Sequence, residues 1–352
     1  MIIDKIIDSL NINGTLLYLT QYGSHLYGTN TENSDLDFRG VYIPTIDDLI
    51  LHKDKDEINE ELQIKITPGK HVDEDGDVIW NPGFIEYKKV DVKIFSLQKF
   101  IQLCSKADTN ALDLLFSYTN KDVESYLYTK NGQYINPLAA MLTYKHKLIN
   151  TDRLESPITY AFKQATKYGM KGKRRLLMLQ ILEKAKLLSD IHTVQDIVPL
   201  IQNMFDDKYL RIDELDNKGK TEKYLFVCGI QHQFNLSIEK FKQRLQDKID
   251  KEYTSQRTIN ASDGNDWKAL SHAIRILFEI KQLLETQTIR FPVDSIIKQI
   301  KLGQICREEI DNLFNNTFEN IMEQIKQNSL NWKYNEEFWD NFILEYTKEA
   351  NE

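Results

Sequence analysis

The chain of 352 residues is long enough for one large domain or two ordinary ones, and its 41% hydrophobic and 28% charged residues are typical of globular proteins. It contains no run of about 18 apolar residues, which a membrane span requires, so we expect a cytoplasmic protein without membrane contact. The net charge of -8 argues against a surface that is basic throughout. Contact with nucleic acid would therefore need a local basic groove. The cysteines lack the paired spacing of zinc sites or disulfide frameworks, and we expect buried thiols at Cys104, Cys228 and Cys306.

The first part of the chain mixes helix and strand patterns. Apolar residues at helical spacing predict an amphipathic helix over residues 2–10, which Asn13-Gly14 ends. Uncharged residues 15–22 predict a strand buried on both faces. Alternation of polar and apolar residues predicts half-buried strands over 35–43 and 88–95. After the second of these, Ser96 is a suitable N-cap for the first of two helices that would pack on the sheet.

The stretch between the two alternating strands, residues 52–88, is charged and contains several glycines and prolines. We expect an insertion there, formed as a loose hairpin that could cover the active site. From Pro137 onward nearly everything has a helical pattern, with stretches near 159–169, 172–189, 193–204, 229–249, 266–286 and 303–327. This change predicts a domain over residues 1–135 and a mostly helical domain over residues 136–352.

The segment Tyr22–Pro44 concentrates the residues that carry chemistry. A strand ends there at Gly23-Ser24, where glycine lets the backbone approach a ligand closely and the following N–H groups can bind phosphate oxygens, at the start of a short helix. Asp35 and Asp37 follow at positions i and i+2 of a strand, so both carboxylates leave the same face, about 6–7 Å apart. Such a pair repels itself unless cations are bound. Asp91, alone among valines on a later strand, would complete a two-metal site for phosphoryl transfer.

An Asp-x-Asp pattern alone is weak in a chain with 53 acidic residues. It also occurs at Asp54/Asp56, Asp73/Asp75 and Asp75/Asp77, which we interpret as a solvated acidic loop. Only Asp35/Asp37 combines a strand with a preceding strand-Gly-Ser turn, and the pattern alone leaves catalytic and solvated readings about equally weighted.

The sequence GSHLYGTNTENSDLDFRGVYIP resembles the signature of the DNA polymerase beta nucleotidyltransferase superfamily. Together with VDVKIFSLQKFIQL, NALDLLF, KALSHAIRILFEIKQLLET and IKLGQICREEI, it resembles the RNA-ligase-associated group of that superfamily, predicted to act in RNA repair. The similarity covers most of the fold and is sharpest in residues 22–44. The family pattern has Asn-Pro and then Glu where this chain has Thr109-Asn110 and Asp113, and we expect this departure to affect only a structural turn.

The resemblance implies an α+β fold, a polymerase-beta-like small mixed sheet flanked by helices and followed by a mostly α-helical domain that closes the nucleotide cleft. It also implies transfer of a nucleoside monophosphate from an NTP with two Mg²⁺ or Mn²⁺ ions and release of pyrophosphate. In that reading Asp35, Asp37 and Asp91 bind the metals, and Gly23 and Ser24 hold the triphosphate. The acceptor would be an RNA end, such as that of a tRNA, and an RNA ligase is a possible partner.

Two further sets of residues are weaker candidates. Lys268, His272 and Arg275 fall at i, i+4 and i+7 on one helical face and could close over the nucleotide phosphates, although a solvated face is the commoner explanation. A basic run interleaved with aromatic residues suits a nucleic-acid groove, although a solvated helix is somewhat favoured there too. Its candidate residues are Lys167, Lys171, Lys173, Arg174 and Arg175.

Two alternatives to RNA-end transfer remain open. The same chemistry could modify a hydroxyl of a protein or a small molecule. A nucleotide-binding module that has lost catalysis is also possible, but the presence of all three aspartates disfavours it.

Overall fold

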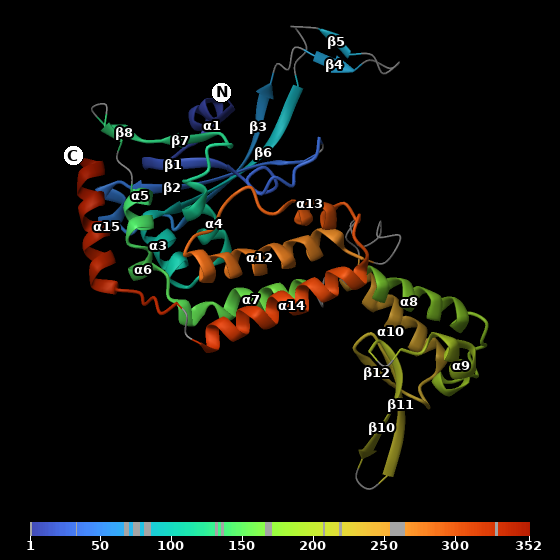
Figure 1. The fold of residues 1–352 in the computed structure, drawn as a ribbon. Coiled ribbons are helices and arrows are strands. Elements are labelled where there is room, and N and C mark those ends of the chain that lie inside the picture. The colour runs from blue at the N-terminus through green and yellow to red at the C-terminus, as the bar shows by residue number, and fades with distance from the viewer. Residues whose placement is uncertain are drawn as a thin grey trace. The chain divides into compact units, whose positions relative to one another are not determined.

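A computed structural model describes residues 2–32, 34–66, 70–72, 78–80, 86–130, 133–134, 137–165, 171–206, 208–217, 220–253, 265–327 and 330–352. The chain forms two compact units. Unit 1 is discontinuous and contains Met1–Ala161 and Ser271–Glu352, whereas unit 2 is the continuous stretch Phe162–Leu270. Figure 1 shows the elements of both. Among the described residues, no helix has the length and apolar character that crossing a bilayer requires.

Unit 1 contains a mixed five-stranded sheet in the order β3-β6-β2-β1-β7. Strands β2 and β6 are parallel, and the other neighbours are antiparallel. The three strands predicted over 15–22, 35–43 and 88–95 are confirmed as β1, β2 and β6, although β2 begins one residue later than predicted. Their bounds, with those of the smaller strands of unit 1, are β1 Gly14–Tyr22, β2 Leu36–Pro44, β3 Glu57–Ile66, β4 Lys70–Val72, β5 Val78–Trp80, β6 Glu86–Ser96, β7 Ser125–Leu127, β8 Thr129–Lys130 and β9 Gln133–Tyr134.

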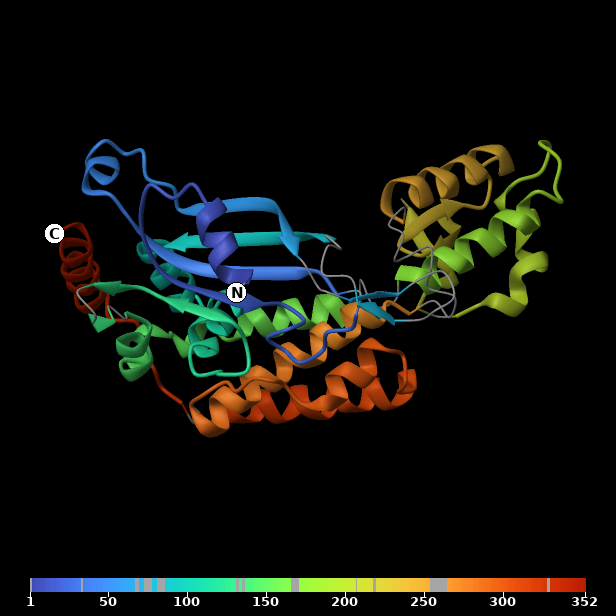
Figure 2. The same cartoon turned by 90° about the horizontal axis from the view of Figure 1, so that it is seen from above.

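Helices cover both faces of this sheet, as Figures 1 and 2 show. The amphipathic helix α1 (Ile2–Ser9) buries Ile3 and Ile6 on one face. Helices α3 (Leu97–Ser105) and α4 (Thr109–Ser117) lie on the other, where the hydroxyl groups of Tyr18 and Ser117 are 3.2 Å apart. The predicted N-cap is confirmed, since Ser96 Oγ accepts from the N–H of Lys99 at 3.2 Å.

The expectation of an insertion over residues 52–88 is wrong for its first part. Residues 57–66 form β3, which pairs with β6 along its whole length and is therefore an edge strand of the sheet. Charged residues on one face gave this segment its loop-like composition, but Ile58 and Ile64 are buried on the other. Beyond it, β4 and β5 pair as a short antiparallel hairpin. Residues 67–69, 73–77 and 81–85 lie outside the described residues.

The remaining helices of unit 1 come from both ends of its sequence. Helices α7, α12 and α14 lie side by side in both views (Figures 1 and 2). The C-terminal helix α15 returns to the sheet, where the carbonyl of Ala350 accepts from Thr15 Oγ1 at 3.3 Å. The bounds are α2 Ile46–Ile50, α5 Pro137–Thr143, α6 Lys145–Leu148, α7 Glu155–Lys163, α12 Trp267–Thr286, α13 Ser295–Lys301, α14 Arg307–Lys326 and α15 Glu336–Asn351, with a 3-10 turn at Thr151–Arg153.

Unit 2 packs helices against one face of a three-stranded antiparallel sheet in the order β10-β11-β12. Its core includes Ile181, Leu225 and Phe241, each fully buried. The helix expected over residues 229–249 is partly wrong, because its first residues form β12 and the helix begins at Ile238. The bounds are α8 Lys171–Ala185, α9 Val194–Ile201, β10 Leu210–Asn217, β11 Lys220–Val227, β12 Ile230–Gln233 and α10 Ile238–Glu252, with a 3-10 turn at Gln202–Met204.

The compact units differ from the division expected at residue 135. The helices after Pro137 do not form one separate domain, because α5–α7 and α12–α15 share the contacts of the sheet-containing unit. The change from mixed to helical patterns marks where the strands of this sheet end, and contacts within the unit continue past it.

The burial of the cysteines is only partly as expected, because Cys104 and Cys228 are buried but Cys306 is exposed.

His232 makes the stability of unit 2 sensitive to acid. The imidazole is fully buried, neither ring nitrogen has a hydrogen-bond partner among the residues that the structure describes, and Phe241 packs edge-on at 4.8 Å. Burial, with a smaller effect of Arg244, lowers the pKa of His232 from 6.5 to about 4. A lowered pKa in the folded state adds stability above pH 6.5 that is lost as the pH falls through 4. We expect unit 2 to lose roughly 3 kcal/mol over this range.

Calorimetric unfolding of the full chain between pH 7 and pH 4 tests this prediction. The unit 2 transition of the His232→Leu variant should depend less on pH than that of the wild type. Equal pH dependence in the two proteins would contradict it.

Candidate active site

The turn after β1 forms the backbone part of the candidate site. Gly23 has φ of 62°, and the chain then turns through residues 23–28, with the N–H of Tyr27 donating to the carbonyl of Gly23 at 3.1 Å. A turn therefore stands where a short helix was expected. No backbone carbonyl of the described residues accepts from the N–H groups of Ser24, His25 or Leu26. Consecutive N–H groups in such a turn can bind an anion.

The predicted carboxylates lie next to this turn. Asp37 pairs with Asp91 in the parallel register of β2 and β6, so the two side chains are neighbours on the same face. Asp35 precedes β2 by one residue and is exposed. A Cβ atom on Gly23 would overlap the carboxylate of Asp37, which shows how closely the turn approaches it. The structure thus brings the turn, Asp37 and Asp91 together, and Asp35 lies immediately before the first residue of β2.

The surroundings of Asp91 include two charged residues that the sequence did not single out. Glu61 on β3 is its register partner, and Lys89 Nζ lies 3.1 Å from Glu61 and 3.9 Å from Asp91 Oδ1. Asp91 Oδ1 is buried and has no hydrogen-bond partner among the described residues, although 44% of the side chain is exposed. Alternation along β3 could have shown that Glu61 is on a sheet face, but its register to Asp91 required the fold.

The arrangement partly fits divalent cations. Within the described parts of the chain, no group of three or more His, Cys, Asp or Glu side chains has the geometry of a metal site. Mg²⁺, however, is usually held by one or two carboxylates together with substrate phosphates and water. Asp37 and Asp91 supply such a pair, and Asp91 Oδ1 accepts no hydrogen bond from the part of the chain that the structure describes. These residues therefore suit a cation that arrives with a phosphate ligand.

His25 lies in the turn and was not among the predicted site residues. Its Nε2 is buried, and no described residue forms a hydrogen bond with it. Burial lowers the pKa of His25; Asp37 opposes this effect, and Lys88 and Lys301 add to it. His25 therefore interacts electrostatically with one carboxylate and two ammonium groups. The imidazole is therefore neutral at pH 7 and can accept or donate a proton in a hydrogen bond.

The distal helix does not present the cationic face that its spacing predicted. Arg275 on α12 is only 3% exposed, and its Nη1 is 2.8 Å from Asp113 Oδ2 and 2.5 Å from Glu279 Oε1. His272 is half-buried, with Nδ1 3.0 Å from Arg275 Nη2, and Lys268 is exposed. The guanidinium of Arg275 is thus enclosed by protein carboxylates.

Asp113 was expected to affect only a structural turn, but in the structure it forms the centre of a buried polar cluster. Its Oδ2 accepts from Arg275, from Tyr27 OH at 2.7 Å and from Tyr22 OH at 3.3 Å. Burial raises the pKa of Glu279 well above its usual range, and Arg275 counteracts only part of that effect. The cluster connects α4 and α12 to both ends of the Gly23-Ser24 turn. An aspartate within the otherwise apolar Ala111–Phe116 was the available sequence signal.

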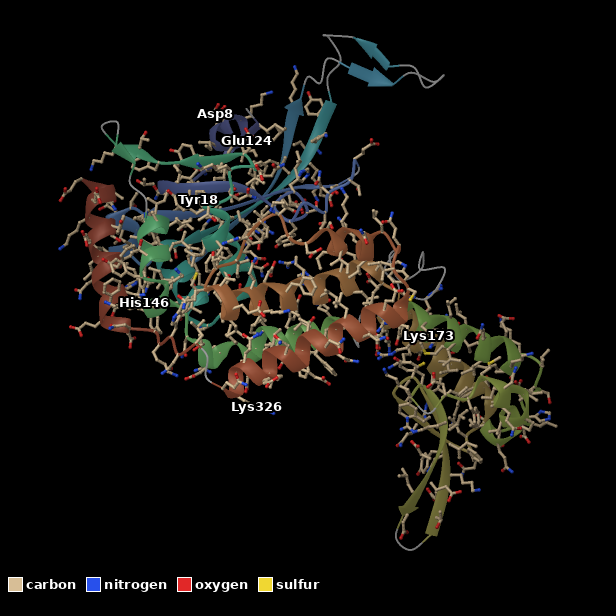
Figure 3. The ribbon with its side chains drawn as sticks, in the orientation of Figure 1. Asp8, Tyr18, Glu124, His146, Lys173 and Lys326 are labelled. Carbon is tan, nitrogen blue, oxygen red and sulfur yellow. The ribbon has the colours of Figure 1, made fainter. Side chains whose placement is uncertain are left out.

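The basic run is only partly described. Lys167 lies outside the described residues, and Lys171 begins α8, with its side chain also outside them. Lys173, which Figure 3 labels, and Arg174 lie near Tyr209, which directly precedes β10. Lys173 Nζ, Arg174 Cζ and Lys208 Nζ are 5.9, 5.2 and 5.4 Å from the centre of the Tyr209 ring. Arg175 is half-buried on the same helix. Two residues of the basic run therefore lie beside an aromatic ring, together with Lys208, which was not part of the predicted run.

Replacing Gly23 by alanine should impair the site more than the fold. The left-handed backbone conformation costs a non-glycine residue about 1–2 kcal/mol, and the new methyl group would displace the carboxylate of Asp37. We expect a small loss of stability, measured by urea unfolding, together with loss of the activity proposed below. The matched control is Gly229→Ala, because a Cβ there meets nothing within 4 Å, although its φ is also positive, at 94°. Full activity of Gly23→Ala would contradict the close approach.

Comparison with known proteins adds two findings. Residues 3–148 match the model of a family described as the RNA repair pathway DNA polymerase beta family. The chain is also 26% identical over 344 residues to an uncharacterized 38.9 kDa protein from the nrdC-mobD intergenic region of Enterobacteria phage T4, covering 92% of this chain and 94% of that protein. No solved structure is significantly similar. The family match contains the turn and all three aspartates, and the similarity to the phage protein extends over both units.

Proposed function

Since residues 3–148 belong to the RNA-repair-associated group of the DNA polymerase beta superfamily, we propose that this chain transfers a nucleoside monophosphate from an NTP to a hydroxyl group at an RNA end. The observation that carries this proposal is the position of Asp37 between the Gly23 turn and Asp91. An anion-binding turn beside paired carboxylates suits a substrate that carries both phosphates and cations.

We assign different roles in the reaction to the turn and to the three aspartates. The N–H groups of Ser24, His25 and Leu26 would bind phosphate oxygens and orient the NTP. Asp35, Asp37 and Asp91 would hold two Mg²⁺ or Mn²⁺ ions. When bound, such ions neutralise developing charge on the attacking and leaving oxygens. Asp91 has an acceptor oxygen without a donor, so it can also orient the acceptor hydroxyl and take up its proton.

The charge distribution favours a nucleic-acid acceptor. Unit 2 contains 20 lysines and arginines against 15 aspartates and glutamates, a net charge of +5, so the rest of the chain, which totals -8, carries -13. The cations around Tyr209 belong to this basic unit. Contacts between such side chains and phosphates supply most of the sequence-independent affinity for nucleic acids. Unit 2 is therefore the part that we expect to bind the RNA.

The test is incubation of the pure protein with each α-labelled NTP, Mg²⁺ or Mn²⁺, and total cellular RNA. Label in RNA that is absent from an Asp35→Ala/Asp37→Ala control would support the proposal and identify the nucleotide. Absence of label in RNA with all four NTPs would refute the RNA acceptor. Label on protein in the same samples would instead indicate protein nucleotidylation.

A further inference from the structure

We infer that Lys301, at the end of α13, binds the triphosphate of the nucleotide at the Gly23–Thr29 turn. This inference rests on the proposed function for the identity of the ligand. Lys301 lies outside residues 3–148, which match the family model. It belongs to IKLGQICREEI, one of the segments that carry the family resemblance, but no role was predicted for it from the sequence. The turn and α13 both belong to unit 1.

Contacts from the segment before α13 fix Lys301 beside the turn. The N–H of Val293 donates to the carbonyl of Tyr27 at 3.3 Å, and the rings of Phe291 and Tyr27 have centres 5.9 Å apart. Pro292 packs so closely on Gly28 that a Cβ there would lie 2.7 Å from it. These contacts lead the chain into α13 directly alongside the turn.

Lys301 then reaches the turn itself. Its Nζ donates to the carbonyl of Thr29 at 2.8 Å, and the N–H of Thr29 donates to the carbonyl of Ser24 at 2.9 Å. The ammonium group is therefore two hydrogen bonds away from Ser24, whose N–H is part of the anion-binding turn. The influence of Lys301 on the pKa of His25 agrees with this proximity. The half-buried position limits screening by solvent.

The chemistry of the ammonium group suits a triphosphate. It carries three N–H donors, so it can hold one carbonyl and still meet a phosphate oxygen. A triphosphate also needs positive charge at a site where Asp35, Asp37 and Asp91 are all acidic. Arg275 cannot provide it, because Asp113 and Glu279 enclose its guanidinium. Lys301 thus takes the role that the spacing on α12 had suggested for other residues.

The experiment measures binding of tripolyphosphate, in Mg²⁺, to the full chain by calorimetry at several salt concentrations. This probe has no base, so the result does not depend on which NTP is used. Lys301→Met should weaken binding about 10–100-fold, the value of a hydrogen bond between charged groups. It should also reduce the dependence of affinity on salt. Lys298→Met, on the same helix, is the matched control and should bind within twofold of the wild type.

A second variant distinguishes direct contact between Lys301 and phosphate from a role of Lys301 in holding the turn in place. Tyr27→Phe loosens the turn by removing its hydrogen bond to Asp113 but leaves all charges in place, so its salt dependence should equal that of the wild type. The inference is overturned if the wild type does not bind tripolyphosphate, if Lys301→Met binds normally, or if it binds weakly with unchanged salt dependence. Failure of nucleotide transfer to RNA with these binding results intact would refute the proposed function alone.

Discussion

Asp37→Asn is expected to lower nucleotide transfer by roughly 1,000-fold or more, because a bound cation contributes several kcal/mol to stabilising the transition state. Asparagine keeps the size of the side chain and so preserves the packing against Gly23. It removes the charge that would pair with a metal ion next to Asp91. The effect should therefore appear in the rate of transfer and not in the stability of the fold.

The measurement is single-turnover transfer of the labelled NTP to RNA, with urea unfolding of the same preparations. Asp47→Asn, an exposed position on α2, is the control and should retain full activity. A rate for Asp37→Asn within tenfold of the wild type would show that Asp37 does not hold a catalytic ion.

Arg275→Met is expected to destabilise unit 1 by about 3–5 kcal/mol, the usual consequence of removing one member of a buried ion pair. The substitution leaves Asp113 and Glu279 buried without their shared cation. The two tyrosines that donate to Asp113 can satisfy only part of the remaining charge. Because both tyrosines flank the Gly23-Ser24 turn, weaker nucleotide binding should accompany the loss of stability.

Fluorescence of Trp332 and Trp339 reports on this change, because both tryptophans are buried in unit 1. Replacing Trp80 and Trp267 by phenylalanine in all proteins isolates their signal. Urea unfolding of Arg275→Met is then compared with that of Lys281→Met, a half-exposed position on the same helix. Equal stability of the two variants would mean that the cluster is not a stabilising ion pair.

Local patterns predicted the strands of the sheet well but not its edge. The strands β1, β2 and β6 have strong alternation or continuous apolar residues, and each was predicted from these signals alone. Strand β3 was missed because Glu57, Glu60, Glu61 and Lys65 dominate its composition, while pairing with β6 decides its structure. The helix α15 was also missed. The division into units depends on contacts between residues before 161 and after 271, which no local pattern contains.

The candidate site was predictable where spacing alone determines position. The turn follows from Gly23, and alternation along β2 sets the face of Asp37. The shared face of Asp35 stays a prediction, because Asp35 precedes the first residue of β2. The parallel register of Asp37 and Asp91 agrees with the prediction that they share a site. The role of Arg275 was not predictable, since helical spacing shows which residues share a face but not whether another helix buries that face. Lys301 lies in a segment that carries the family resemblance, but its contact with Thr29 spans 272 residues and could not be predicted from local patterns.

The discontinuity of unit 1 has a consequence for synthesis of the chain. Unit 2 is one uninterrupted stretch, so it can fold as soon as residue 270 has left the ribosome. The strands of the unit 1 sheet are synthesised first, but the cluster around Asp113 forms only after Arg275 has been synthesised, and the contact of the Gly23–Thr29 turn with Lys301 only after Lys301 has been. The hydrogen bond from Lys130 Nζ to the carbonyl of Glu349 can form only when nearly the whole chain has been synthesised. The part of the protein that is translated first is therefore the last to be completed.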